Sequence, residues 1–319
     1  MEIIKSGSGK WEVGSGLSRI VMRPLLLTTY YLLLTAYCLY AGTGRTGAEF
    51  LRINISARSS AMGDAFTASA DDAGALYSNP AGLSYVKQKE IMATHIKWFS
   101  DISSEFVGYV HPVADNSTLG ISGTYLYVTP FDRTDMLGDA TGEKNKMSDF
   151  AGIISCARSF GKNNDISLGV NIKTLVSQLG DYNSLTFGII DVGTIYKSPD
   201  NGLKLGLSLQ NFELFGMGIM FSEISDPLPI TLNSGLSYTQ KPLTVMADIG
   251  YPVYDSTVNI RAGIELTPIE NLCLRGGYKS QTESFSGGFG LNFKEFHFDY
   301  AWVPNDIGDL HFITFSAKF

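Results

Sequence analysis

Cysteine and charged residues are scarce in this chain of 319 residues. Asp, Glu, Lys and Arg together make up 17% of it, against about a quarter in ordinary soluble domains. No cluster of Lys and Arg is large enough to indicate nucleic-acid binding. Of the three cysteines, Cys156 and Cys273 fall far apart within expected strands, and their spacing leaves open whether they pair.

Motifs for catalysis and metal binding are also missing. The four histidines, at positions 95, 111, 297 and 311, show no His-Glu-x-x-His or other metal spacing. Gly120-Ile-Ser-Gly123 lacks the Gly-x-Ser-x-Gly frame of a nucleophile elbow. An outer-membrane lipase would need a serine, a histidine and a polar orienting group close together, and nothing in the sequence requires that. We therefore expect no enzymatic activity, no catalytic or metal site and no cofactor.

The longest apolar run lies near the N-terminus. Arg19 and Arg23 precede residues 25–40, which are mostly apolar, and small residues follow at 41–44. Positive charge, an apolar stretch and a small-residue exit are typical of a secretory signal peptide. We therefore expect residues 1–43 to be a signal that exports the chain.

Two details of this segment stay open. Residues 1–21 add nothing to the signal, so Met22 is an alternative start. The apolar run also approaches the ~20 residues of a membrane-spanning helix, which makes a retained anchor the alternative to cleavage. No later segment is long and apolar enough for such a helix, so the mature chain is either soluble and exported or inserted as a barrel.

From residue 91 onward, apolar residues alternate with small or polar ones. In one segment, Ile166, Leu168, Val170 and Ile172 alternate with Ser167, Gly169, Asn171 and Lys173. Successive side chains of a strand point to opposite faces, so each such segment has one apolar face. A soluble sandwich can alternate too, but apolar stripes of this purity in so many strands favour lipid. The pattern predicts an all-β, antiparallel, transmembrane barrel in the outer membrane of a Gram-negative cell.

The alternation and the turn residues between segments divide residues 91–319 into about fourteen strands. The expected strands span residues 91–99, 103–112, 117–128, 149–160, 165–177, 185–197, 203–210, 229–239, 243–250, 257–267, 271–279, 285–293, 295–303 and 310–319. Short connections rich in Gly, Pro, Asn and Asp follow the even-numbered strands, whereas the long connections, 129–148 and 211–228, follow odd-numbered ones. Outer-membrane barrels place short turns in the periplasm and long loops outside.

Residues 44–90 do not alternate and are rich in small residues. Asp71 or Asp72 is an expected cap for a short helix over residues 73–77, and Asn79-Pro80 is expected to end it. Small residues allow close backbone approach. We expect a short helical segment that either plugs the lumen or caps the barrel from the periplasm.

This segment carries a family resemblance. The residues concerned are Met62, Gly63, Asp64, Ala65, Phe66, Asp71, Asp72, Asn79, Pro80, Ala81 and Gly82. Their arrangement resembles the N-terminal signature of the PorV/PorQ family of outer-membrane proteins, which is related to FadL-type fatty-acid channels. The resemblance implies a FadL-like barrel with an N-terminal plug.

The resemblance also implies two alternative functions. PorV-like members serve the type IX secretion system, in which they receive secreted proteins and pass them to surface-attachment machinery. We favour that function, with secretion components and secreted cargo as partners. The alternative is a channel for hydrophobic small molecules, with a hydrophobic ligand or lipid in the lumen. Outer-membrane lipid and the barrel-assembly machinery, which would recognise the terminal Phe319, are expected partners of either.

Two groups of residues are candidates for the function. The first is an apolar stretch of the second long loop, expected to bind a partner or ligand or to fold over the lumen: Phe212, Leu214, Phe215, Met217, Ile219, Met220 and Phe221. The second is a set of charges expected to face the lumen: Lys173, Lys204, Asp248, Arg261, Glu265, Arg275 and Asp299. Such charges form a structural network or select solutes.

Overall fold

A computed structural model describes residues 46–99, 101–161, 163–199, 201–216, 218–221, 225–255 and 257–319. The chain divides into two units, Met1–Gly42 and Thr43–Phe319, and the described residues all belong to the second. The expected signal peptide and Met217 lie outside the described residues. Within the described ranges, no helix is both long and apolar enough to span a membrane.

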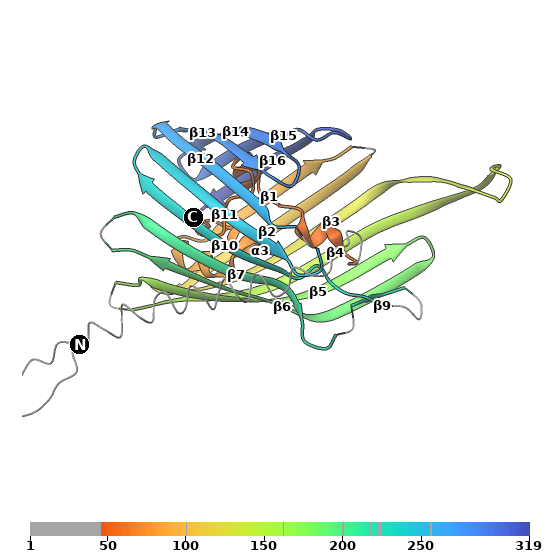
Figure 1. Ribbon diagram of the computed structural model, residues 1–319, viewed down its shortest axis with the longest axis horizontal. Coiled ribbons are helices and arrows are strands. Elements are labelled where there is room, and N and C mark those ends of the chain that lie inside the picture. The colour runs from red at the N-terminus through yellow and green to blue at the C-terminus, as the bar shows by residue number, and fades with distance from the viewer. Residues whose placement is uncertain are drawn as a thin grey trace, which may run out of the picture. The chain divides into compact units, whose positions relative to one another are not determined.

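Fourteen antiparallel strands close into a barrel, as the alternation predicts (Figure 1). They are β1 (Glu90–Lys97), β2 (Ile102–Ala114), β3 (Ser117–Thr134), β4 (Ala140–Phe160), β5 (Ile166–Leu179), β6 (Tyr182–Lys197), β7 (Leu203–Glu213), β10 (Thr231–Gln240), β11 (Leu243–Pro252), β12 (Asn259–Ile269), β13 (Leu272–Lys279), β14 (Ser284–Phe293), β15 (Phe296–Val303) and β16 (Leu310–Lys318). Each strand pairs with its neighbours along the chain, and β16 closes the ring on β1, where Glu90 lies opposite Lys318.

The apolar stripes face outward and the small or polar positions face the lumen. On β5, Leu168 and Ile172 are 47% and 59% exposed, whereas Asn171 on the opposite face is fully buried. Side chains of Ile, Leu, Val and Phe continue this exposed apolar surface around the other strands. A continuous apolar exterior on a closed ring of strands suits hydrocarbon rather than water.

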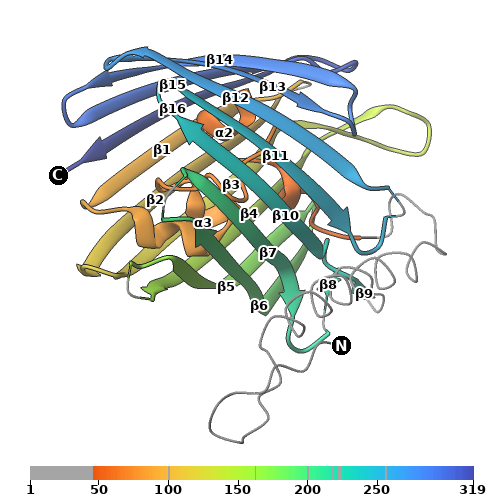
Figure 2. The ribbon, with the colours of Figure 1, turned by 60° about the vertical axis from the view of Figure 1, so that its left-hand side comes forward.

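The segment before the barrel lies inside the ring of strands (Figure 2). It forms four short helical turns, η1 (Glu49–Arg52), α2 (Ala57–Ala61), α3 (Ala75–Ser78) and η2 (Pro80–Tyr85). The turn η2 packs against β3 to β6, and α2 packs against β13 to β16. We call residues 46–89 the plug.

Glycines of the wall let the plug backbone approach closely. A Cβ atom built on Gly169 of β5 would lie 2.2 Å from the carbonyl carbon of Pro80. One built on Gly206 of β7 would lie 2.4 Å from the carbonyl oxygen of Thr67. Because no real side chain tolerates such distances, the small residues of plug and wall together permit this fit.

The two long connections contain regular β structure beyond the expected strand ends. The ladder of β3 and β4 continues as far as Thr134 and Ala140, so most of 129–148 is a hairpin that projects past the neighbouring strands (Figure 1). Its charges face one another across the strands, with Lys144 Nζ 3.5 Å from Asp132 and Arg133 3.1 Å from Glu143. Opposite-charge pairs stabilise a strand ladder that lies outside lipid. The polar composition of residues 129–148 gave no indication of this ladder.

The second connection contains a small two-stranded sheet. Its strands are β8 (Ile219–Met220) and β9 (Ser225–Asp226), which pair antiparallel. The shorter turns, such as residues 241–242 and 270–271, lie at the opposite end of the strands. We call the two ends the loop end and the turn end.

The tight fit of the plug makes Gly169→Ala a sensitive test. The added methyl group would overlap Pro80, and overpacking of this kind costs about 1–3 kcal/mol. We expect a lower unfolding midpoint, measured by heat-modifiable gel mobility of the refolded barrel. The matched control is Gly276→Ala, whose Cβ would meet its nearest atom, Ile264 Cγ2, at an ordinary 3.5 Å. Equal midpoints for the two variants would contradict close packing at Gly169.

Candidate functional site in the lumen

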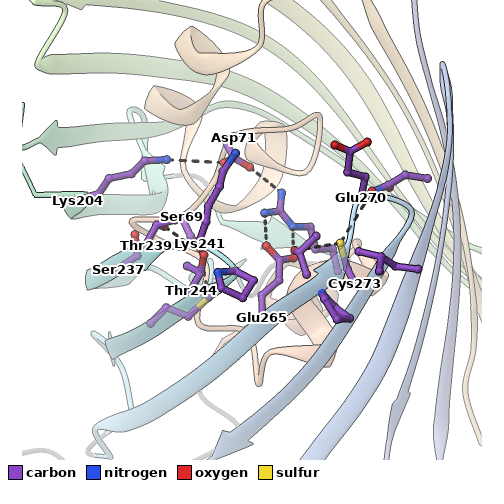
Figure 3. Close-up of a pocket in the computed structure, with 17 residues that line it drawn as sticks. Ser69, Asp71, Lys204, Ser237, Thr239, Lys241, Thr244, Glu265, Glu270 and Cys273 are labelled. Carbon is purple, nitrogen blue, oxygen red and sulfur yellow. Dashed lines mark hydrogen bonds and ion pairs between the residues drawn. The ribbon is translucent and has the colours of Figure 1, made fainter.

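The plug separates a pocket at the loop end of the lumen from a cavity at the turn end. The loop-end pocket has a volume of about 370 Å³ and is mainly apolar. Its apolar lining comprises Ala48, Phe50, Ile53, Trp98, Ile102, Leu126, Val128, Met147, Leu179, Ile219 and Phe221. The turn-end cavity, about 590 Å³, is lined by charged and hydroxyl groups together with the short turns (Figure 3).

The apolar residues of the second long loop divide between two surfaces. Ile219 is 2% exposed and, with Phe221, packs on a cluster formed by Phe50, Leu175 and others at the pocket. At the apolar mouth of the lumen Ile219 is therefore buried and Phe221 half-buried, so this part of the stretch folds over the lumen. The residues Phe212, Leu214, Phe215 and Met220 are exposed.

The exposed half of this loop lies against the outer wall. Phe215 contacts Phe187 of β6 edge to face, with ring centroids 6.1 Å apart. Both rings are more than half exposed, at 62% and 52%. Aromatic rings at the rim of an apolar wall fit the boundary between lipid and water.

Arg58 is the centre of an ionic network that joins plug and wall at the turn end. Its guanidinium lies 2.6 Å from Asp71 and 2.8 Å from Asp72, both in the plug, and 3.0 Å from Glu265 of β12. The network extends through Glu265 to Arg275, at 2.7 Å, and from Arg275 to Asp299 of β15, at 2.6 Å. One half-buried arginine thereby neutralises carboxylates from two parts of the molecule.

Asp71 also meets the wall on the other side of the cavity. Lys204 Nζ of β7 lies 3.7 Å from its carboxylate, and both groups line the cavity (Figure 3). Burial raises the pKa of the Asp71 carboxyl, but the positive charges of Arg58 and Lys204 outweigh burial and hold that pKa below its usual range.

Asp248 of β11 holds the middle of the plug. Its Oδ2 accepts hydrogen bonds from the backbone N–H groups of Phe66 and Thr67, at 2.9 and 2.8 Å. Arg261 lies 4.0 Å from the same oxygen and donates to Asn233. The Asp248 carboxylate therefore binds the plug backbone and does not line an open channel.

A second buried pair lies on the opposite wall. Lys173 Nζ is 2.8 Å from Asp191, with the two side chains 2% and 0% exposed. Asn171 and Asn211 satisfy the remaining polar atoms of the pair. All seven expected lumen charges therefore lie inside the barrel, and each makes an ion pair with another residue.

The residues that carry the family resemblance pack within the plug and against the wall. Asn79, fully buried, donates its Nδ2 to the carbonyl of Thr67 at 2.8 Å and accepts from the N–H of Ala81 at 3.2 Å. It thereby caps η2, whereas α3 begins without a side-chain cap; Asp72 instead accepts from the N–H of Gly74. Asn79 is a cross-link between two plug turns.

The first residues of this signature, 62–64, lie beside β13. Met62, Ala65 and Phe66 are buried in the main apolar cluster. Gly63 has a φ of +63°, and its added Cβ would lie 2.6 Å from the carbonyl oxygen of Tyr278. Asp64 forms an ion pair with Lys279 of β13.

Other candidate groups do not come together. His297 faces the lumen beside Asn292, whereas His311 lies on the other face beside Tyr300. Cys156 is exposed, Cys273 is buried, and both are free. Within the described ranges, no group of three or more His, Cys, Asp or Glu side chains is placed to hold a metal ion.

Little in the sequence indicated two residues that form ion pairs inside the barrel, Arg58 and Asp191. Arg58 stands alone in a stretch of small residues, which was its only signal. Asp191 was hidden because a bulge near Gly188 shifts the register of β6 against β5 and interrupts the alternation.

Comparisons with known proteins match this geometry at the level of fold. The model of an uncharacterised protein family, UPF0164, matches residues 41–184. No curated protein matches the chain. The likeness to PorV/PorQ specifically is not shown by these comparisons.

Several solved barrels resemble the structure. The Pseudomonas putida toluene transporter TodX gives a TM-score of 0.57 at 14% identity, covering 87% of this chain and 96% of that one. A TodX deltaS2S3 mutant, described as a monoaromatic hydrocarbon channel, gives 0.59 at 16% identity, covering 82% and 98%. A Pseudomonas aeruginosa FadL homologue gives 0.53 at 11% identity, covering 80% and 96%. These likenesses show a shared barrel fold.

Removing the centre of the ionic network should loosen the plug. In Arg58→Gln, three carboxylates lose their shared partner. Because Arg58 is 19% and Asp71 38% exposed, the cost lies between the ~1 kcal/mol of an exposed pair and the ~3–5 kcal/mol of a buried one. We expect a lower unfolding midpoint and a higher ion conductance in planar bilayers. The control is Arg133→Gln on the projecting hairpin, where an exposed pair contributes about 1 kcal/mol or less. Unchanged conductance in Arg58→Gln would show that other contacts hold the plug.

The low pKa of Asp71 predicts the pH range of its contribution. A carboxyl whose pKa is lowered by folding stabilises the folded state. This stabilisation is complete above the pKa of the group in the unfolded chain, about 3.9, and is lost as the pH falls below that value. The midpoint of the unaltered chain should exceed that of Asp71→Asn by a constant amount between about pH 8 and 5, and the difference should shrink progressively as the pH falls below about 4. A difference that vanishes already near pH 6 would contradict the assignment.

Proposed function

We propose that this protein lies in the outer membrane of a Gram-negative cell and admits hydrophobic small molecules into its lumen. The loop-end pocket carries the proposal. Its volume of about 370 Å³ lies within the ~300–1,000 Å³ range of small-molecule sites. Phe50, Trp98, Leu126 and Phe221 give it an apolar interior at the end of the barrel that faces the long loops.

The fold supports the same proposal. An apolar exterior suits insertion in a bilayer, and proteins with this fold include structures described as a toluene transporter and a monoaromatic hydrocarbon channel. In this proposal the pocket is the first acceptor and the plug is the gate below it.

The plug is attached differently on its two sides, which suggests how a gate would move. Toward β1, β2 and β4 it packs through apolar side chains, among them Phe106, Val110 and Ile153. Toward β12, β13 and β15 it is held by the ionic network of Arg58. We infer that the ionic side yields first, because ion pairs can be exchanged for water whereas apolar contacts cannot.

Secretion remains a second candidate. The exposed side chains of Phe212, Leu214 and Met220 could dock a secreted protein or a type IX component. Phe319, 63% exposed, is available to the barrel-assembly machinery whichever function holds. The lipid-boundary position of Phe215 accounts for part of the same apolar surface without a protein partner, so we place hydrophobic transport first.

A polar substitution in the pocket tests the proposal. In Leu126→Asn, binding of the uncharged fluorophore N-phenyl-1-naphthylamine to the barrel in nanodiscs should weaken about tenfold, equivalent to ~1.4 kcal/mol. The matched control is Leu137→Asn at the tip of the projecting hairpin, where the side chain is 88% exposed and lies outside the pocket. Equal binding by both variants, or no binding above empty nanodiscs, would contradict a ligand site at Leu126.

A further inference from the structure

Every charged residue that lines the loop-end pocket is acidic. These residues are Glu49, Asp149 and Asp226, and the lining contains no Lys, Arg or His. Glu49 is neutralised by Arg52, at 3.1 Å. Over the described part of the chain, Asp149 and Asp226 form no ion pair with a basic residue. The pocket therefore combines an apolar interior with carboxylates that lack a protein counter-ion.

Asp149 has a defined place in the wall of this pocket. In the strand register it lies opposite Leu126 of β3 and Ser177 of β5, and both of these residues also line the pocket. Ser177 is 1% exposed, and its hydroxyl has no hydrogen-bond partner apart from the neighbouring Asp149 carboxylate. A buried hydroxyl that donates to a carboxylate keeps its acceptor lone pairs free, so the two groups together can accept from the donor of a polar headgroup.

The basic groups that line the adjacent cavity are paired within the protein. They are Arg52 and Lys279. Arg52 is bound by Glu49 and Asp255, and Lys279 is bound by Asp64. Each of these two positive charges therefore already has a carboxylate partner within the protein.

From these observations we propose that the loop-end pocket selects hydrophobic molecules bearing an amine over fatty-acid anions, with Asp149 as the counter-ion of the bound ammonium. This inference rests on the proposed uptake of hydrophobic molecules. A carboxylate headgroup would be held beside like charge in a site of low dielectric, where repulsion is weakly screened. An ammonium would instead satisfy Asp149 and donate to the Ser177 hydroxyl, while its chain lies on Phe50 and Leu126.

Three ligands of one chain length test the proposal. Octylammonium, octanol and octanoate are titrated at pH 7.5 against N-phenyl-1-naphthylamine bound to the full chain in nanodiscs, with empty nanodiscs as the partition blank. We expect octylammonium to displace the probe at a concentration at least tenfold lower than octanoate, with octanol between them. In Asp149→Asn, octylammonium should lose its advantage over octanol, while octanol itself is unchanged.

One control isolates the role of Asp149. Asp139→Asn, at the exposed tip of the projecting hairpin, removes an equal charge outside the pocket lining and should keep the original order.

The outcomes separate the two proposals. Octanoate binding as tightly as octylammonium, or an ammonium preference that survives in Asp149→Asn, would overturn the charge selection. Octanol binding with no ammonium preference would overturn it while leaving hydrophobic uptake standing. Failure of the probe and of all three ligands to bind would instead remove the uptake on which the inference rests.

Discussion

A closed ring of fourteen strands encloses a lumen too wide for its own side chains to fill, and this constraint shapes the rest of the molecule. The chain meets it by placing residues 46–89 inside the ring. Those residues must carry their backbone polar groups through the lumen, so the wall has to supply partners for them. Asp248 accepts from plug N–H groups, and Gln210 donates to plug carbonyls. The inward polar face of the strands is thus a matched surface for the plug.

The same constraint explains why the plug sequence is dominated by small residues. Close backbone contact at Gly169 and Gly206 leaves no room for longer side chains on either surface. Charge is concentrated instead around Arg58 and the turn-end cavity. The plug thus has one side held by apolar contacts and one side held by ion pairs, and the proposed gate would open on the ionic side.

The pocket at the loop end arises where the plug begins and the second long loop turns inward. Ile219 and Phe221 cover it, and Phe50 closes it from below. Its lining comes from six separate segments of the chain, so the character of the site arises only when they assemble. In the proposed function the apolar volume holds the chain of a hydrophobic ligand, and in the proposed charge selection Asp149 favours an ammonium headgroup.

The sequence by itself determined the strand number, the lipid-facing and lumen-facing positions, and the segment of small residues that precedes the barrel. These properties are local, because alternation and turn composition repeat within a few residues of one another. Tertiary structure alone decided that Arg58 is the ionic centre, that Asp191 pairs with Lys173, and that Ile219 is buried. Each of these depends on register across strands or on contacts over long sequence separations. A bulge near Gly188 or an opposite-charge ladder beyond residue 129 changes such contacts without a clear trace in the local pattern.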